Sequence, residues 1–301
     1  MTATVLAIKV DVDTYEGTRE GVPRLMEIMG ERGVSASFFL SLGPDNSGKA
    51  IWRVFTRPGF LAKQLRTKAP SAFGWRTLLR GTLLPAPIIG KDLKPLTDSL
   101  QSSGHEVGLH AWDHVYWHDR LWKMTPQEAA AEVERGIAAF RDLIGGIPQG
   151  FAAPAWRINL ASAQALKDAG VVYTAATRGQ TPFRPVLEGQ ELDLPELPTT
   201  LPTADEILGR DGIGPNDLAD YWLDRMSDSD LNVLTIHAEM EGRILAKNFA
   251  DFLDRILARG IRVERLIDVV QTLPRNGHDL PWCEVARAEI PGRSGRVSVQ
   301  A

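Results

Sequence analysis

The sequence contains very little cysteine, with only Cys283 in 301 residues. A single cysteine excludes an intrachain disulfide framework and is typical of proteins kept in a reducing compartment. Long apolar runs are also missing, because no stretch approaches the roughly 18 apolar residues that a membrane-spanning helix needs. The first apolar run, VLAIKVDV, is interrupted by Lys9 and Asp11 and follows no basic segment, which favours a buried strand over a signal peptide. We therefore expect a cytoplasmic protein.

An excess of positive charge is missing as well. The chain has 34 Lys and Arg against 38 Asp and Glu, a net charge of −4, which argues against general nucleic-acid binding. Nothing in the sequence indicates a protein partner. The hydrophobic fraction of 44% is ordinary for a globular protein that buries a substantial core.

Turn residues divide the chain into a strand–helix rhythm. Apolar, β-branched segments predict strands at 5–12, 35–43, 106–112, 150–155, 171–176, 231–239 and 260–266. Helical spacing predicts helices at 18–32, 95–102, 126–144, 159–169 and 248–259. Because no break in composition interrupts this rhythm, we predict an α/β fold with one catalytic domain over residues 1–273. An incomplete or distorted (β/α) barrel is the leading architecture, and a doubly wound open sheet is the alternative.

Two segments fall outside the rhythm. Residues 44–92 form a long insertion after the second predicted strand. Residues 274–301 are rich in Pro and Gly without apolar periodicity, so we expect a loose C-terminal tail.

Candidate catalytic side chains follow three of the predicted strands. The first strand ends in Asp11 and Asp13, the third in His110 and His114, and a later one in His237. A barrel gathers catalytic residues at the C-terminal ends of its strands. One carboxylate and two histidines form an open zinc site, whose bound water has a pKa of about 7. A second carboxylate can take the water's proton and another histidine can protonate a leaving amine, which together describe amide hydrolysis.

Each of these features alone also has a simpler explanation. Strand-end aspartates often cap helices, the pair His110 and His114 can lie on a solvated turn, and His237 can be a hydrogen-bonded core histidine. Their joint placement after three strands favours an active site.

The segments DVD, HAWDH, FAAPAW and LTIH resemble, in this order, the motifs of the metal-dependent polysaccharide deacetylases, the NodB-homology or carbohydrate esterase family 4 group. The resemblance covers residues 4–270 and implies a barrel of that type. It implies Asp11 as general base and His237 as general acid, with Leu234 lining the pocket. It further implies one divalent metal ion, held by Asp13, His110 and His114. Zinc is the expected metal, and cobalt, manganese, nickel or ferrous iron would also suit these ligands.

The chain departs from the family pattern at two places. Ala152 stands where the third motif usually has an arginine, so Arg157 or Arg178 is expected to orient the base. The carboxylate that tunes the acid histidine is not evident, and Asp113 and Glu239 are the candidates for it. Trp156 is a further candidate for contact with the substrate.

Additional segments, among them RGQTPFRP and LPTTLPTADEILGRD, resemble family members that act on a lipid-linked sugar. The resemblance implies removal of formyl from undecaprenyl-phosphate 4-deoxy-4-formamido-L-arabinose, in the lipid A modification that gives polymyxin resistance. The alternatives are a deacetylase of another N-acylated sugar or glycan, and a non-catalytic lipid-binding protein on a decayed scaffold.

The composition of the insertion indicates contact with a membrane. Between Asp45 and Asp92 there are nine basic residues and no acidic one, interleaved with Trp, Phe and Leu. This composition is typical of segments that lie in the interface of an anionic bilayer. We predict peripheral association with the cytoplasmic face of the inner membrane; the alternative is a solvated basic face packed on the body. The predicted membrane-facing residues are Trp52, Arg53, Arg57, Lys63, Arg66 and Trp75.

Overall fold

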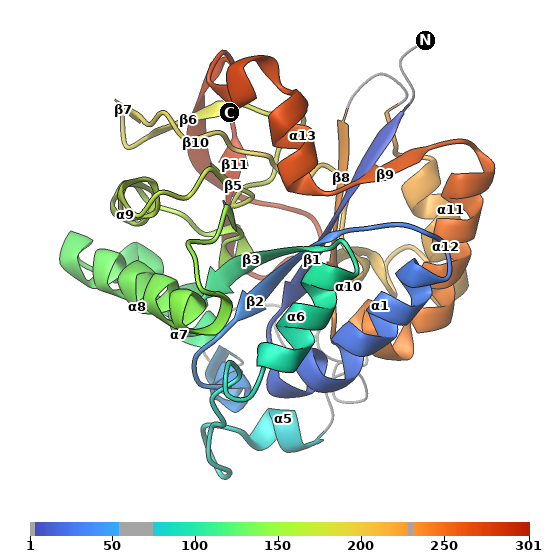
Figure 1. The fold of residues 1–301 in the computed structure, drawn as a ribbon, viewed down its shortest axis with the longest axis horizontal. Helices are drawn as coiled ribbons and strands as arrows, with labels where there is room; N and C mark the ends of the chain where they lie inside the picture. The colour runs from blue at the N-terminus through green and yellow to red at the C-terminus, as the bar shows by residue number, and fades with distance from the viewer. Residues whose placement is uncertain (1–3, 54–74, 228–230) are drawn as a thin grey trace.

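The computed structural model describes residues 4–53, 75–227 and 231–301. Seven parallel strands form its central sheet: β1 (Val5–Val12), β2 (Ser37–Ser41), β3 (Glu106–Ala111), β4 (Gly150–Phe151), β5 (Tyr173–Thr174), β8 (Leu231–His237) and β9 (Arg262–Glu264). Their order is β5-β4-β3-β2-β1-β8 (Figure 1). The first residues of β1 pair with β9 and its last residues with β2, so two strands share one edge of β1. The sheet is a partly closed barrel, which confirms the predicted single-domain architecture.

Helices cover both sides of this sheet. In Figure 1, α8 (Pro126–Ile144) and α9 (Leu160–Asp168) lie on one flank, and α1 (Val22–Gly30), α11 (Leu218–Leu223) and α12 (Ala246–Ala258) on the other. The described residues also form the α-helices α5 (Trp75–Leu79), α6 (Lys94–Ser102), α7 (His114–Arg120), α10 (Ala204–Ile207) and α13 (Leu266–Thr272). They include short 3-10 and π-helices: η1 (Gly17–Gly21), η2 (Ser47–Trp52), η3 (Leu121–Lys123), η4 (Pro154–Trp156), η5 (Pro215–Asp217), η6 (Met240–Ile244) and η7 (Pro274–Gly277).

Local sequence explains where the elements begin and end. Thr125 and Glu128 form the reciprocal cap that starts α8, and Gly145 ends this helix in the left-handed conformation with φ 92°. The strand predicted at 150–155 is shorter than expected and stops at Phe151. The chain leaves the extended conformation soon afterwards, because Ala155 and Trp156 both have positive φ, at 54° and 49°.

The C-terminal segment is packed, which corrects the expectation of a loose tail at 274–301. β10 (Trp282–Glu289) and β11 (Arg296–Gln300) pair with each other, and β10 pairs with β6 (Arg184–Leu187), which pairs in turn with β7 (Gln190–Glu191). Val297 and Ser298 are buried. The N–H of Arg178 donates to the carbonyl of Ser298 at 2.9 Å. No residue of β10 is fully buried, so its sequence has no apolar periodicity.

The described ends of the insertion are anchored to the body. Arg80 donates to Glu16 and, at 2.9 Å, to Asp45, whose side chain is fully buried. Arg53 was predicted to face a membrane, but it is 8% exposed and binds Asp119 at 2.9 Å. The predicted membrane contacts Arg57, Lys63 and Arg66, and the side chains of Trp52 and Trp75, lie outside the described residues. In the described ranges, no helix has the length and apolar character required to cross a bilayer.

The packing of β11 predicts a stability difference between two valines. Val297 is 2% exposed, whereas Val172 is 40% exposed. Val297→Ala should lower the free energy of unfolding by about 2 kcal/mol, because it removes buried methyl groups. Val172→Ala should change it by less than about 0.5 kcal/mol. Urea unfolding followed by circular dichroism measures both, and equally small effects would mean that β11 is not packed.

Candidate active site

Three candidate metal ligands meet at the C-terminal ends of β1 and β3. Asp13 follows β1, His110 lies near the end of β3, and His114 is the first residue of α7. Nε2 of His110 is 3.2 Å from Oδ1 of Asp13, and Nε2 of His114 is 3.4 Å from Oδ2. One possible ligand atom from each residue lies within 4.8 Å of the other two. The cluster is therefore compact enough to hold a single metal ion.

The turn between β3 and α7 directs His114 toward this cluster. Asp113 caps α7, because its Oδ1 accepts a hydrogen bond from the N–H of Tyr116 at 2.9 Å. Its Oδ2 accepts another from Nδ2 of Asn46 at 2.6 Å, and its own N–H donates to Glu132 at 3.1 Å. Asp113 thus stabilises the start of α7, where the candidate ligand His114 lies. The role expected for Asp113 was to tune His237.

Burial and charge set the protonation states that a metal requires. Burial raises the pKa of Asp13, but the side chains of His114 and His110 outweigh it and hold this pKa well below its ordinary value. Burial lowers the pKa of His114 to about 4, although Asp13 opposes the shift. An ionised carboxylate and a neutral imidazole are the forms that bind a cation. Oδ1 of Asp13 is buried without a hydrogen-bond partner among the described residues, which also fits a cation at this position.

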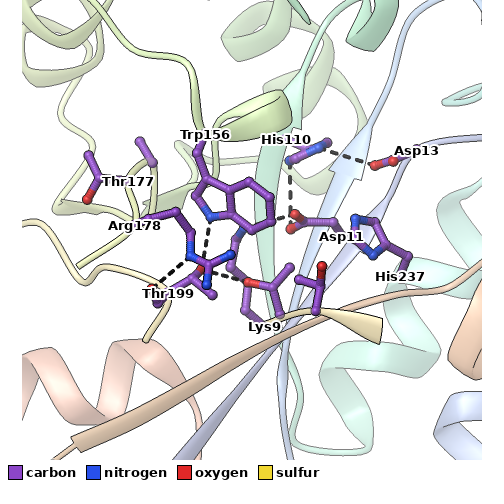
Figure 2. A network of polar contacts seen from close by, with 12 residues as sticks. Lys9, Asp11, Asp13, His110, Trp156, Thr177, Arg178, Thr199 and His237 are labelled. Carbon is purple, nitrogen blue, oxygen red and sulfur yellow. Dashed lines mark hydrogen bonds and ion pairs between the residues drawn. The ribbon is translucent and has the colours of Figure 1, made fainter. Parts of the chain in front are cut away.

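A buried lysine holds Asp11, the aspartate of β1. Lys9 is fully buried, and its Nζ lies 2.8 Å from Oδ2 of Asp11 (Figure 2). The two side chains lie two residues apart on one strand and therefore project from the same face. Oδ1 of Asp11 is 3.8 Å from Nδ1 of His110, so the carboxylate lies beside the metal cluster. An unpaired buried lysine would be costly, and Asp11 supplies its counterion.

The two arginines predicted to orient Asp11 are bound elsewhere. Arg157 donates to the carbonyl of His118 at 2.6 Å and lies over the ring of Trp122. Nη1 of Arg178 donates to both carboxylate oxygens of Glu206 at 2.8 Å. The cation beside Asp11 is therefore Lys9, which the sequence analysis did not single out.

His237 lies beside Asp11, at the end of β8 (Figure 2). Burial lowers its pKa, but the carboxylates of Asp205, Asp13, Asp11 and Glu241 together raise it above the ordinary value. The N–H of His237 donates to Oε2 of Glu241 at 2.8 Å. Burial raises the pKa of Glu241 to about 7. The side chain of His237 is thus surrounded by carboxylates that favour its protonated form.

Glu239 binds the loop that carries Asp13. The role expected for Glu239 was instead to tune His237. Its Oε1 accepts hydrogen bonds from the N–H of Asp13 at 3.0 Å and from the N–H and hydroxyl of Thr14, both at 2.8 Å. Burial and the charge of Asp13 raise the pKa of Glu239 to about 8. This side chain fixes the loop that follows β1.

The two remaining candidates for substrate contact occupy different environments. Leu234 is fully buried in the main hydrophobic core, on the face of β8 opposite to Thr235 and His237, so the predicted pocket contact is wrong. Trp156 is also buried, but beside Asp11, and its indole N–H donates to Thr199 at 3.0 Å (Figure 2). The indole ring therefore lies against the side of the site that holds the Asp11 carboxylate.

The sequence held one signal for the missed lysine. All the residues of β1 from Leu6 to Val10 except Lys9 are apolar and fully buried. A lysine within such a run needs a buried partner. A partner on the same face of a strand stands two residues away, which points to Asp11. No sequence pattern predicts that Asp205 and Glu241 lie near His237, because their positions depend on the geometry of loops.

Comparison with known proteins identifies the family. The sequence model of the polysaccharide deacetylase family matches residues 3–174. A 4-deoxy-4-formamido-L-arabinose-phosphoundecaprenol deformylase of Shewanella sediminis is 41% identical over 298 residues, covering 99% of this chain and 95% of the relative. A protein of the same name from Wigglesworthia glossinidia brevipalpis is 32% identical, covering 94% and 98%. The crystal structure of a Mycobacterium smegmatis polysaccharide deacetylase has a TM-score of 0.64 at 19% identity, covering 96% and 95%. This chain belongs to the polysaccharide deacetylase family.

Proposed function

We propose that this protein hydrolyses the N-formyl amide of undecaprenyl-phosphate 4-deoxy-4-formamido-L-arabinose, giving the free amine and formate. The observation that carries the proposal is the similarity to the Shewanella deformylase, which extends over 99% of the chain and so includes every segment that builds the site. The side chains at the ends of β1, β3 and β8 provide the groups that amide hydrolysis needs. The reaction places the protein in lipid A modification.

The metal ion is held by Asp13, His110 and His114 in this proposal. One carboxylate and two imidazoles suit zinc, and cobalt, manganese, nickel or ferrous iron would be accepted by the same ligands. The bound ion polarises the formamide carbonyl and makes water a stronger acid.

Asp11 acts as the general base and Lys9 positions it. The carboxylate takes a proton from the attacking water, for which its Oδ1, buried without a hydrogen-bond partner among the described residues, is available. Oδ2 is held by Lys9 at 2.8 Å, which fixes the orientation of the group. Lys9 thereby takes the place of the arginine that the third motif of this chain lacks.

His237 acts as the general acid. The C–N bond of the formamide breaks as the sugar nitrogen receives a proton, and the formyl carbon leaves as formate. The carboxylates around His237 raise its pKa, so the protonated form persists to higher pH.

Mass spectrometry tests the reaction directly. Metal-loaded protein is incubated with the formylated lipid-linked sugar and, in parallel, with its N-acetyl analogue. Loss of one formyl unit from the first substrate supports the proposal. An unchanged formyl substrate together with deacetylation of the analogue would favour the deacetylase alternative.

Metal binding and catalysis should separate in two variants. His114→Ala should abolish both bound metal and turnover, because two protein ligands hold a divalent ion poorly. Asp11→Asn should retain the metal but lower kcat by roughly 100-fold or more, because an amide cannot accept the proton. Elemental analysis and formate release measure the two properties. Full turnover in either variant would contradict its assigned role.

The positioning role of Lys9 predicts a difference between two substitutions. Lys9→Met should lower kcat by roughly tenfold or more with KM and metal content nearly unchanged, because the ion pair to Asp11 is lost. Lys9→Arg should restore much of kcat, because it returns a cation. Steady-state kinetics and elemental analysis measure both variants, and equal losses in kcat would show that Lys9 only fills space.

We further propose that the insertion at 44–92 attaches the protein to the cytoplasmic face of the inner membrane. In the part of this segment that the structure describes, two large apolar side chains are exposed: Leu83 at 80% and Ile88 at 42%. Exposed apolar groups beside basic residues favour an anionic bilayer interface.

Vesicle binding tests the attachment. Leu83→Ser should weaken binding to anionic vesicles by about three- to tenfold, because less apolar area is transferred into the bilayer. Val172→Ser is the control, since Val172 is exposed outside the insertion. Flotation measures both variants, and equal binding of the two proteins would leave the insertion as a structural cover.

A further inference from the structure

Arg53 is a buried cation with a free donor near the metal cluster. It is 8% exposed, and its Nε donates to Oδ1 of Asp119 at 2.9 Å. Asp119 lies on α7, the helix that begins with His114, so this hydrogen bond holds Arg53 against the metal-binding helix. Its Nη2 is buried and has no hydrogen-bond partner among the described residues. A buried guanidinium with an unused donor lowers stability unless a ligand accepts a hydrogen bond from that donor.

Arg293 provides a second such donor from the opposite end of the sequence. It lies between β10 and β11, and its side chain is 12% exposed. Its Nη1 lies 3.6 Å from Glu206 and 3.7 Å from Asp205, and has no hydrogen bond among the described residues. The guanidinium carbon lies 4.5 Å from the centre of the Trp156 ring. Nζ of Lys9, which holds Asp11, lies 5.3 Å from the centre of the same ring.

The two arginines lie in each other's electrostatic field. Burial lowers the pKa of Arg53, and the charge of Arg293 lowers it further, whereas Asp119 and Asp13 raise it. Like charges at buried and partly buried sites repel one another. An anion bound to both would remove this repulsion and use the two free donors.

The substrate of the proposed reaction carries a suitable anion. Its phosphate is attached at the anomeric carbon, on the far side of the sugar ring from the formamide at carbon 4. A phosphate site must therefore lie about one sugar ring from the metal cluster. Arg53 is bonded to α7, which begins with His114, and Arg293 lies against the ring of Trp156, which Lys9 also contacts.

We propose that Arg53 and Arg293 together bind the phosphate that links the sugar to its lipid. Guanidinium groups bind phosphate oxygens through pairs of charge-assisted hydrogen bonds. The inference rests on the proposed function, because it takes its ligand from the lipid-linked substrate. The two arginines make no bond to the formamide, so they select the substrate without taking part in the hydrolysis.

Substrate selectivity tests the phosphate site. Arg53→Gln and Arg293→Gln are compared on two formamido sugars, the lipid phosphate diester and the neutral methyl glycoside. Each variant should raise KM for the diester by about ten- to a hundredfold, the effect of losing a hydrogen bond to a charged group. Turnover of the methyl glycoside and metal content should stay unchanged, which also shows that the variants fold. Arg287→Gln is the matched control, since Arg287 is exposed on β10 of the same hairpin.

Direct binding separates this inference from the proposed reaction. Metal-loaded protein should bind farnesyl phosphate at least tenfold more tightly than farnesol or inorganic phosphate, and this preference should fall in both glutamine variants. Arg53→Lys should retain part of it, because the charge remains beside Asp119. If neither sugar releases formate, the proposed reaction is wrong. The binding preference for farnesyl phosphate would still test whether the two arginines bind phosphate. A preference that persists in both variants, or inorganic phosphate binding as tightly as farnesyl phosphate, would overturn the inference.

Discussion

The hydrogen bonds to Glu239 join the two loops on which the site depends. Parallel pairing of β1 with β8 brings Asp11 beside His237 in register, but it does not fix the residues beyond the strands. The buried carboxylate of Glu239, in the loop after β8, fixes the loop that carries Asp13. Gly17 packs directly against this carboxylate and leaves no space for a side chain, because a Cβ on Gly17 would lie 2.0 Å from Oε1 of Glu239. Asp13 and His237 therefore keep their spacing even though they lie far apart in the sequence.

Much of the fold was predictable because local rules and tertiary packing agree. The helix over 126–144 was predicted from its cap residues, and both the cap at Thr125 and the stop at Gly145 are present. The three strand ends that carry Asp13, His110 and His237 were found from apolar runs followed by polar residues. Parallel strands then bring such ends to one edge of a sheet without any further information.

The supporting residues of the site were harder to predict, for physical reasons. The role of Arg53 depends on its contact with Asp119, 66 residues away, and its composition-based interpretation as a membrane contact was wrong. Leu234 was assigned to the pocket by resemblance, but strand alternation turns it into the core. Arg293 lies between β10 and β11, and β10 pairs with β6, which is distant in the sequence. No local sequence pattern therefore predicts the packing that brings Arg293 to Trp156.

The position of β1 has a consequence for how the protein is made. β1 is synthesised before the strands it pairs with, and it lies inside the sheet, between β2 and β9 on one edge and β8 on the other. Until residues 231–237 leave the ribosome, one edge of an almost wholly apolar strand has no partner. Such distant pairings slow folding and expose the edge to aggregation. Asp11 and His237, which this pairing brings together, can therefore meet only after β8 has been synthesised.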